Sequence, residues 1–172
     1  MQTEDTATAE ARELTTKLKS RSAKVGIVGL GYVGLPLALN ALEAGYTVYG
    51  FDVDETKIEA LKSGRSYLSH VPTSTLTRSV EGDRFLPTTD FTHVSECDAV
   101  IICVPTPLGP HRDPDLSYVE RTVDSIAPFL RRGQIISLES STYPGTTREF
   151  VAARCEHRRI TVGEEVFKAD SL

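Results

Sequence analysis

The chain has 172 residues, of which 40% are hydrophobic and 25% are charged, and its formal net charge is -5. This length suits one domain with a substantial core and is too short for two large ones. The hydrophobic and charged fractions are ordinary for a soluble globular protein. The acidic balance and the lack of a basic stripe argue against a nucleic-acid partner.

The first 22 residues are polar and begin Met-Gln-Thr-Glu-Asp, which is the opposite of a secretory signal peptide. No apolar run approaches the length needed to span a bilayer, so we expect a cytoplasmic protein without a membrane partner. Residues 8–19 could form an exposed helix that packs through Leu14 and Leu18, but a solvated leader is the favoured interpretation. We therefore divide the chain into a polar leader, 1–22, and one domain, 23–172.

A glycine-rich stretch organises the domain. The apolar run 25–28 predicts a parallel strand that is buried on both faces. Gly29, Gly31 and Gly34 then form G-x-G-x-x-G where the strand turns into a helix. In order, these glycines allow a tight turn, close approach of a pyrophosphate, and close packing of helix on strand. The helix that follows would offer free N–H groups and a positive dipole end to the phosphates.

Asp52 ends the next predicted strand, 47–51, and follows Gly29 by close to the expected spacing of about 20 residues. Its carboxylate would accept hydrogen bonds from an adenosine ribose and repel a 2′-phosphate, which favours NAD over NADP. Lys57 could reach the same ribose or a phosphate, although such a lysine is more often solvated. The alternative, a structural βαβ unit without a ligand, is the weaker interpretation because strand, helix and acid all accompany the glycines.

The rest of the domain alternates between strands and helices. Further strands are expected at 84–88, 99–104 and 134–138, with an edge strand at 159–162. Helices are expected at 32–44, 54–63, 73–80, 116–130 and 147–155. This alternation predicts an α/β fold, a Rossmann-type doubly wound parallel sheet of about six strands in the order 3-2-1-4-5-6.

Hydroxyl groups follow two of these strands. Thr106 lies between two prolines that restrict the backbone, and its hydroxyl or amide could contact the cofactor. Ser141 and Thr142 follow the strand 134–138 and precede a helix. Such residues are usually helix caps, and the functional alternative places them beside the nicotinamide or its ribose; the sequence weighs the two evenly. Both loops are expected at the carboxyl edge of the sheet, where ligands bind in this fold.

The three cysteines, Cys97, Cys103 and Cys155, have no metal-like spacing, and their odd number argues against a disulfide framework. Cys103 ends an apolar run and is expected to be a small buried hydrophobe. Cys97 sits between two acidic residues, which raise the pKa of its thiol. Cys155 has basic neighbours, which are common around an isolated cysteine. We therefore expect no catalytic nucleophile and no metal site.

Four motifs, in order, resemble the UDP-glucose/GDP-mannose dehydrogenase family, and in particular its UDP-N-acetylglucosamine 6-dehydrogenase branch. They lie at residues 28–38, 103–108, 115–119 and 138–147. The resemblance extends over about residues 23–167 and covers only the N-terminal NAD-binding domain of that family. It implies oxidation of the C6 alcohol of a nucleotide sugar to a carboxylate, with NAD as the oxidant.

The resemblance also implies cofactor contacts, in the order of the chain, at Tyr32, Val33, Asp52, Lys57, Thr106 and Ser141. Thr142 could substitute for Ser141, and Glu139 matches a glutamate of the family. The nucleophilic cysteine and the other catalytic residues of relatives lie in a UDP-sugar domain beyond the part that this sequence matches. We therefore expect no catalytic residue here, no oxidation of a UDP-sugar by the chain alone, and a UDP-sugar partner only when that domain is supplied. Relatives form oligomers, and the alternative to an enzyme part is a free-standing, non-catalytic NAD-binding module or a decayed fragment.

Overall fold

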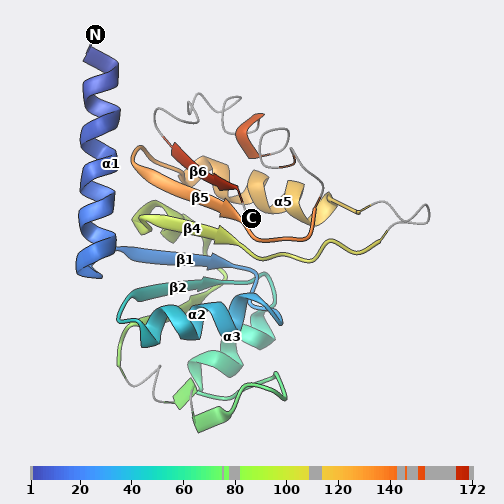
Figure 1. Ribbon diagram of the computed structural model, residues 1–172. Coiled ribbons are helices and arrows are strands. Elements are labelled where there is room, and N and C mark those ends of the chain that lie inside the picture. The colour runs from blue at the N-terminus through green and yellow to red at the C-terminus, as the bar shows by residue number, and fades with distance from the viewer. Residues whose placement is uncertain are drawn as a thin grey trace.

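Six strands form one fully parallel sheet in the order β3-β2-β1-β4-β5-β6 (Figure 1). They are β1 (Lys24–Val28), β2 (Thr47–Phe51), β3 (Phe85–Thr88), β4 (Ala99–Ile102), β5 (Gln134–Leu138) and β6 (Val166–Asp170). The computed structural model describes residues 2–74, 76–77, 82–108, 114–142, 146, 151–153 and 166–170. The predicted fold class and strand order are confirmed.

Two strands differ from their predicted bounds. The strand that pairs with β5 is Val166–Asp170, whereas the predicted range 159–162 lies outside the described residues. Strand β4 ends at Ile102, two residues earlier than expected. The Cys103 N–H still donates to the Val28 carbonyl at 2.7 Å, but Pro105 has no N–H and cannot continue the ladder. Most of the predicted helix 147–155 also lies outside the described residues.

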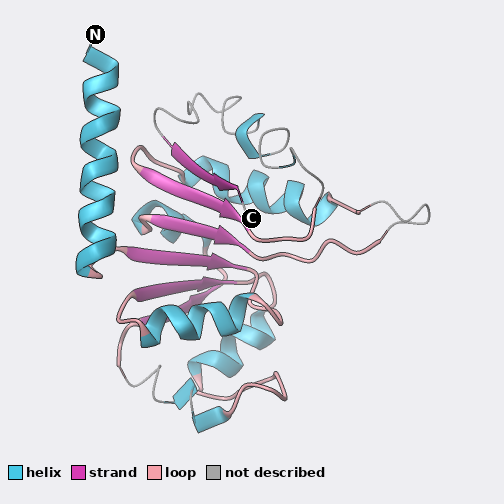
Figure 2. Cartoon of the chain, viewed as in Figure 1, coloured by secondary structure: helices cyan, strands magenta, loops and turns pink. Residues whose placement is uncertain are grey.

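Helices cover both faces of the sheet (Figure 2). On one face α2 (Gly34–Glu43) and α3 (Glu55–Lys62) pack on side chains such as Ile27 and Val48. On the other face lie α5 (Ser117–Ile126), the short 3-10 helix η2 (Ala127–Phe129) and a further 3-10 helix, η1 (Phe91–Glu96). Because side chains alternate along a strand, both faces of the central strands are apolar. The helix η1 was not predicted.

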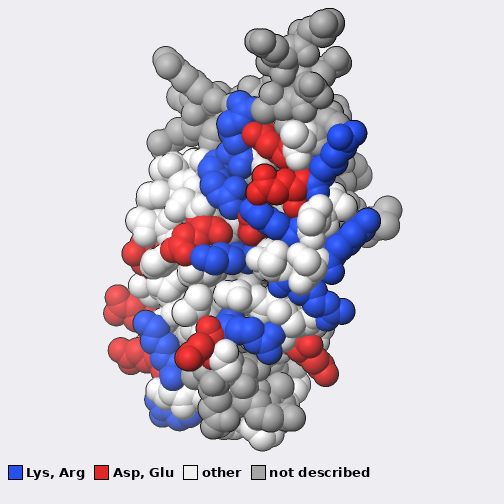
Figure 3. Space-filling view, turned by 90° about the vertical axis from the view of Figure 1, so that its left-hand side faces the viewer, with Lys and Arg blue, Asp and Glu red and all other residues white. Residues whose placement is uncertain are grey.

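The N-terminal segment forms a long helix, α1 (Gln2–Ser20), rather than the solvated leader that the sequence favoured. It lies across the amino ends of the strands (Figure 1), with Leu14 buried and the Leu18 carbonyl accepting from the Tyr46 hydroxyl at 2.9 Å. Charged side chains of both signs gather over this edge (Figure 3). The helix therefore closes the edge of the sheet opposite the predicted cofactor site.

Asp98 fastens α1 to the sheet. Its buried carboxylate accepts from the Lys17 ammonium at 3.1 Å, the Arg131 guanidinium at 3.0 Å and the Lys24 backbone N–H at 3.0 Å. Burial acts to raise the pKa of Asp98, but these hydrogen bonds outweigh burial and lower it. One carboxylate thus joins α1, β1 and the segment before β5.

A second charged cluster holds η1 on the sheet. The Glu96 carboxylate accepts from the Tyr49 hydroxyl at 2.7 Å and the Lys24 ammonium at 2.9 Å, and it pairs with His93 Nδ1 at 2.7 Å. The hydrogen bond from Tyr49 first, and then those from Lys24 and His93, lower the pKa of Glu96 from 4.5 to about 2. The folded state therefore holds the Glu96 carboxylate in its charged form.

We predict an acid-sensitive stability contribution from Glu96. A depressed folded-state pKa adds stability that is present above pH 4.5 and is lost as the pH falls from 4.5 towards 2. Urea unfolding followed across this interval should show a smaller loss for Glu96→Gln than for the unmodified chain. Glu59→Gln, on the exposed surface of α3, is the control and should leave the slope unchanged. Equal slopes for all three proteins would contradict this assignment.

Candidate functional site

The strand register brings the predicted site residues to one edge of the sheet. Val28 pairs with both Phe51 of β2 and Ile102 of β4, and Ile102 pairs with Leu138 of β5. The residues that follow these four strand ends therefore meet at the carboxyl edge. This edge is where ligands bind in open parallel α/β sheets.

Two of the three glycines are required by the fold itself. Gly29 has a φ of +93°, and its N–H donates to the Phe51 carbonyl at 2.8 Å. A Cβ on Gly29 would lie 2.7 Å from the Cys103 carbonyl oxygen, and a Cβ on Gly34 would lie 1.8 Å from the Gly29 carbonyl oxygen. No side chain fits at either position, because backbone atoms occupy the space.

Gly31 is different, because nothing among the described residues requires a glycine there. A Cβ built on Gly31 meets no atom within 4 Å, and the residue is not among the glycines with positive φ. The open space lies beside the start of α2, whose N-cap residue Val33 makes no side-chain cap and whose first turn has no acid. By contrast, Asp54 caps α3 by accepting from Thr56 N. The turn therefore offers an anion the N–H groups of α2 without a competing carboxylate.

Asp52 is buried, and three groups hold its carboxylate. Oδ2 accepts from the Leu30 N–H at 2.9 Å and from the Lys57 ammonium at 3.0 Å, while Oδ1 accepts from the Asp54 N–H at 3.0 Å. A carboxylate has about four lone-pair positions, so one position on Oδ1 remains free. A second position, on Oδ2, is occupied by the Lys57 ammonium, which another hydrogen-bond donor could displace. The structure thus brings Asp52 and Lys57 together with the glycine turn, as predicted.

Thr106 and Ser141 also meet, but through a contact within the protein. The Thr106 hydroxyl donates to the Ser141 carbonyl at 2.7 Å, and the Ser140 hydroxyl donates to the Val104 carbonyl at 2.7 Å. These two bonds fix the spacing of the loops after β4 and β5. The side chain of Ser141 is exposed and Thr142 is half-buried. Both side chains therefore remain candidates for the predicted contact with the cofactor.

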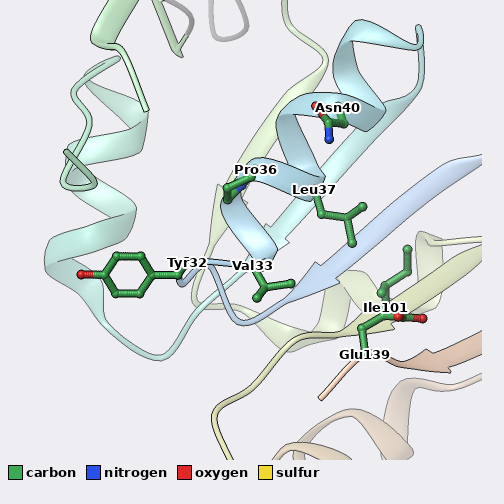
Figure 4. A pocket seen from close by; sticks show the side chains of 7 residues that line it. All are labelled: Tyr32, Val33, Pro36, Leu37, Asn40, Ile101 and Glu139. Atoms are coloured by element: carbon green, nitrogen blue, oxygen red, sulfur yellow. The ribbon is translucent and has the colours of Figure 1, made fainter. Parts of the chain in front are cut away.

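A cavity of about 450 Å³ runs from the glycine turn along α2 to the end of β5. It is lined by Tyr32, Val33, Pro36, Leu37, Asn40, Ile101 and Glu139. Figure 4 shows Val33 and Leu37 directed towards Ile101, whereas the ring of Tyr32 points away from them. Glu139 lies at the far end and accepts from the Ser137 hydroxyl at 2.5 Å. Apart from Tyr32, Val33 and Glu139, these lining residues were not predicted at the site from the sequence.

The loop that follows α3 makes two contacts with the glycine turn that were not predicted from the sequence. The Tyr67 hydroxyl donates to the Leu30 carbonyl at 2.6 Å. The His70 ring stacks on Tyr32, with centroids 5.6 Å apart and planes at 16°. The only signal in the sequence was a tyrosine and a histidine within the predicted loop, and neither pattern indicates such contacts.

The two described cysteines are free thiols buried in the core. Burial, and secondarily the charges of Asp98 and Glu96, raises the pKa of Cys97 to about 12. Burial likewise raises the pKa of Cys103 to about 11. Neither is suited to act as a thiolate nucleophile at neutral pH, while Cys155 lies outside the described residues.

The part of the chain that the structure describes contains no group of three or more His, Cys, Asp or Glu side chains that could hold a metal ion. Its helices are too short or too polar to cross a bilayer.

A parallel sheet in this order, with a glycine turn after β1 and a buried acid after β2, defines a Rossmann-type dinucleotide-binding domain. Residues 23–168 match the model of the UDP-glucose/GDP-mannose dehydrogenase family, NAD binding domain. The chain belongs to this family of NAD-dependent dehydrogenases, and NAD is the cofactor of the matched domain.

The chain is similar to curated and solved members of the family. It is 36% identical over 129 residues to UDP-N-acetyl-D-glucosamine 6-dehydrogenase of Pseudomonas aeruginosa, covering 75% of this chain and 30% of that protein. It is 38% identical over 130 residues to UDP-N-acetyl-D-mannosamine dehydrogenase of Methanococcus maripaludis, covering 73% and 30%. A ternary complex of GDP-mannose dehydrogenase from Pseudomonas aeruginosa superposes with a TM-score of 0.81 at 30% identity, covering 85% and 35%. The chain thus spans about 30% of the length of these curated relatives.

We predict opposite outcomes for alanine at two of the glycines. Gly31→Ala should fold with an unfolding midpoint close to that of the unmodified chain, because its Cβ enters open space, but should bind NAD at least about tenfold more weakly. Gly34→Ala should lose at least about 4 kcal/mol of stability, because its Cβ would overlap the Gly29 carbonyl. Thermal unfolding and calorimetric titration with NAD measure both effects. A Gly31→Ala variant with unchanged NAD affinity would show that no ligand occupies that space.

We also predict that Asp52→Asn weakens NAD binding by roughly ten- to a hundredfold, because a charged acceptor is replaced by a neutral one. The same variant should discriminate less against NADP, since the repulsion of a 2′-phosphate is removed. Asp54→Asn is the matched control, because asparagine also caps a helix and the side chain of Asp54 caps α3. Equal NAD affinities for the two variants would contradict the role of Asp52.

Proposed function

We propose that this chain is the cofactor-binding part of a nucleotide-sugar 6-dehydrogenase. The complete enzyme would oxidise the C6 alcohol of a UDP-sugar to a uronic acid. Resemblance to the relatives favours a UDP-N-acetylhexosamine as the substrate. Family membership and the names of the relatives, which include UDP-N-acetyl-D-glucosamine and UDP-N-acetyl-D-mannosamine dehydrogenases, support this proposal. The observation that carries it is the open space at Gly31 beside the buried carboxylate of Asp52.

In this proposal the glycine turn and Asp52 bind the adenosine half of the cofactor. The backbone at Gly29, Gly31 and Gly34 lets the pyrophosphate approach the start of α2, and Tyr32 and Val33 flank it there. Asp52 accepts from the ribose hydroxyls through the free lone pair on Oδ1. Lys57, 3.0 Å from Oδ2, yields its position to the second ribose hydroxyl or turns towards a phosphate.

The loops after β4 and β5 would orient the other half of the cofactor. Thr106 and either Ser141 or Thr142 lie beside the nicotinamide ribose in this proposal, on loops whose spacing is fixed by two hydrogen bonds. When bound, NAD supplies the hydride acceptor. The contribution of these residues is orientation, because a hydroxyl engaged with a carbonyl can still accept a hydrogen bond through its oxygen.

Catalysis would require groups that the described residues do not offer. Both described thiols are buried with raised pKa values, and the resemblance assigns the nucleophile to a separate UDP-sugar domain. We therefore propose that the chain alone is inactive, and that it meets a UDP-sugar and forms the oligomers of its relatives only together with that domain. Free buried thiols fit a reducing compartment, so we propose a cytoplasmic location.

The expected result for the purified chain is heat of binding with millimolar NAD and weaker binding of NADP. With NAD and UDP-N-acetylglucosamine together, we expect no formation of NADH, because the family resemblance assigns the catalytic nucleophile to a domain other than the NAD-binding domain matched here. Absence of any NAD binding would overturn the cofactor-binding function. Formation of NADH from UDP-N-acetylglucosamine would instead overturn the proposed inactivity.

If NAD binds but a separately expressed UDP-sugar domain restores no activity, the chain is a free-standing NAD-binding module. The control for restored activity is the Gly31→Ala variant mixed with the same domain. Its NADH formation should fall with its affinity for NAD.

A further inference from the structure

The loop 65–72 contacts the glycine turn on both sides of Gly31. Tyr67 reaches the residue before it, through the 2.6 Å hydrogen bond to the Leu30 carbonyl. His70 reaches the residue after it, through the ring stack on Tyr32. Tyr32 is 76% exposed, so this stack is its principal ring contact among the described residues. Gly31, with open space around its Cα, is thus held at both neighbours by a single loop.

The two hydrogen bonds of Leu30 hold the peptide groups on either side of it, and the one from Tyr67 holds the peptide between Leu30 and Gly31. The Leu30 N–H donates to Asp52 Oδ2 at 2.9 Å and its carbonyl accepts from Tyr67. A trans peptide is planar with its C=O and N–H on opposite sides, so the N–H of Gly31 points away from the Tyr67 hydroxyl. Glycine tolerates either orientation of such a peptide at little steric cost. The orientation of the Gly31 N–H therefore depends on the hydrogen bond from Tyr67.

Buried side chains and hydrogen bonds within the loop 65–72 hold the loop in place. Leu68 and Val71 are buried in the core cluster beneath α2 and α3. The Ser66 hydroxyl donates to the Leu68 carbonyl at 2.9 Å, and the Val71 N–H donates to the same carbonyl at 3.0 Å. Burial, and then the charges of Asp52 and Asp54, raises the pKa of Tyr67, so its hydroxyl remains a donor at all ordinary pH values.

We propose that Tyr67 and His70 form a clamp that holds the Gly31 turn in the conformation that receives the pyrophosphate of the cofactor. Both are positioning residues, since each acts through the backbone or side chain of its neighbour in the turn. The clamp rests on the proposed function of the turn. It predicts a selective effect: ligands that carry a pyrophosphate depend on the clamp, whereas adenosine, which would reach only Asp52, does not.

The test is the variant Tyr67→Phe, which removes only the hydroxyl. Its affinities for NAD and ADP-ribose should fall about five- to tenfold, the value of one hydrogen bond, while its affinity for adenosine stays unchanged. Tyr46→Phe is the matched control, because it also removes a tyrosine hydroxyl that donates to a backbone carbonyl, that of Leu18, at the opposite edge of the sheet. It should change no affinity.

The outcomes separate the clamp from the function on which it rests. If the unmodified chain does not bind NAD, the proposed function fails. If the unmodified chain binds NAD and Tyr67→Phe binds it equally well, the clamp is wrong. The clamp is also wrong if the affinity of Tyr67→Phe for adenosine falls as much as its affinity for NAD. Should Tyr67→Phe fail to fold, His70→Ala tests the second contact at an exposed side chain. It should weaken NAD and ADP-ribose about threefold, and unchanged affinities would overturn the clamp.

Discussion

The buried carboxylate of Asp52 joins three elements of the proposed cofactor site. It follows β2, accepts from the glycine turn at Leu30, and accepts from Asp54 and Lys57 at the start of α3. A buried charge is stable only when it is paired and hydrogen-bonded, and here two backbone N–H groups supply permanent partners. Among the described residues, Lys57 supplies the side-chain partner, and in the proposed site a ribose hydroxyl would replace it. The two backbone hydrogen bonds therefore fix the position of the carboxylate in the proposed cofactor site.

Steric contacts between backbone atoms explain why this part of the site could be predicted from the sequence. The positions of Gly29 and Gly34 follow from the close approach of α2 to the turn, and this approach leaves a pattern of glycines at fixed spacing. Asp52 is placed by the length of one strand–helix–strand unit. Because these constraints are local in the chain, the sequence carries them directly. The alternation of apolar strands with helices along the chain likewise predicted the strand order.

The features that were missed depend on contacts between distant residues. The helix α1 has few apolar residues, and its attachment through Lys17 and Asp98 joins positions far apart in the sequence. The contacts of Tyr67 and His70 arise because the loop after α3 folds back over the turn. The cavity along α2 is formed with Ile101 of β4 and with Glu139, which follows β5. No periodicity or motif reports such pairings, so only the structure shows them.

A titration with NAD, followed by nuclear magnetic resonance of the backbone amides, tests the proposed cofactor site most directly. We expect the largest shifts at residues 29–34 and 52–57, with a second group at Thr106 and residues 141–142. Amides on α1 and at the amino edge around Asp98 should not move. Shifts confined to residues 36–40 of α2, or spread over the amino edge while the glycine turn stays unchanged, would contradict the assignment of the cofactor site.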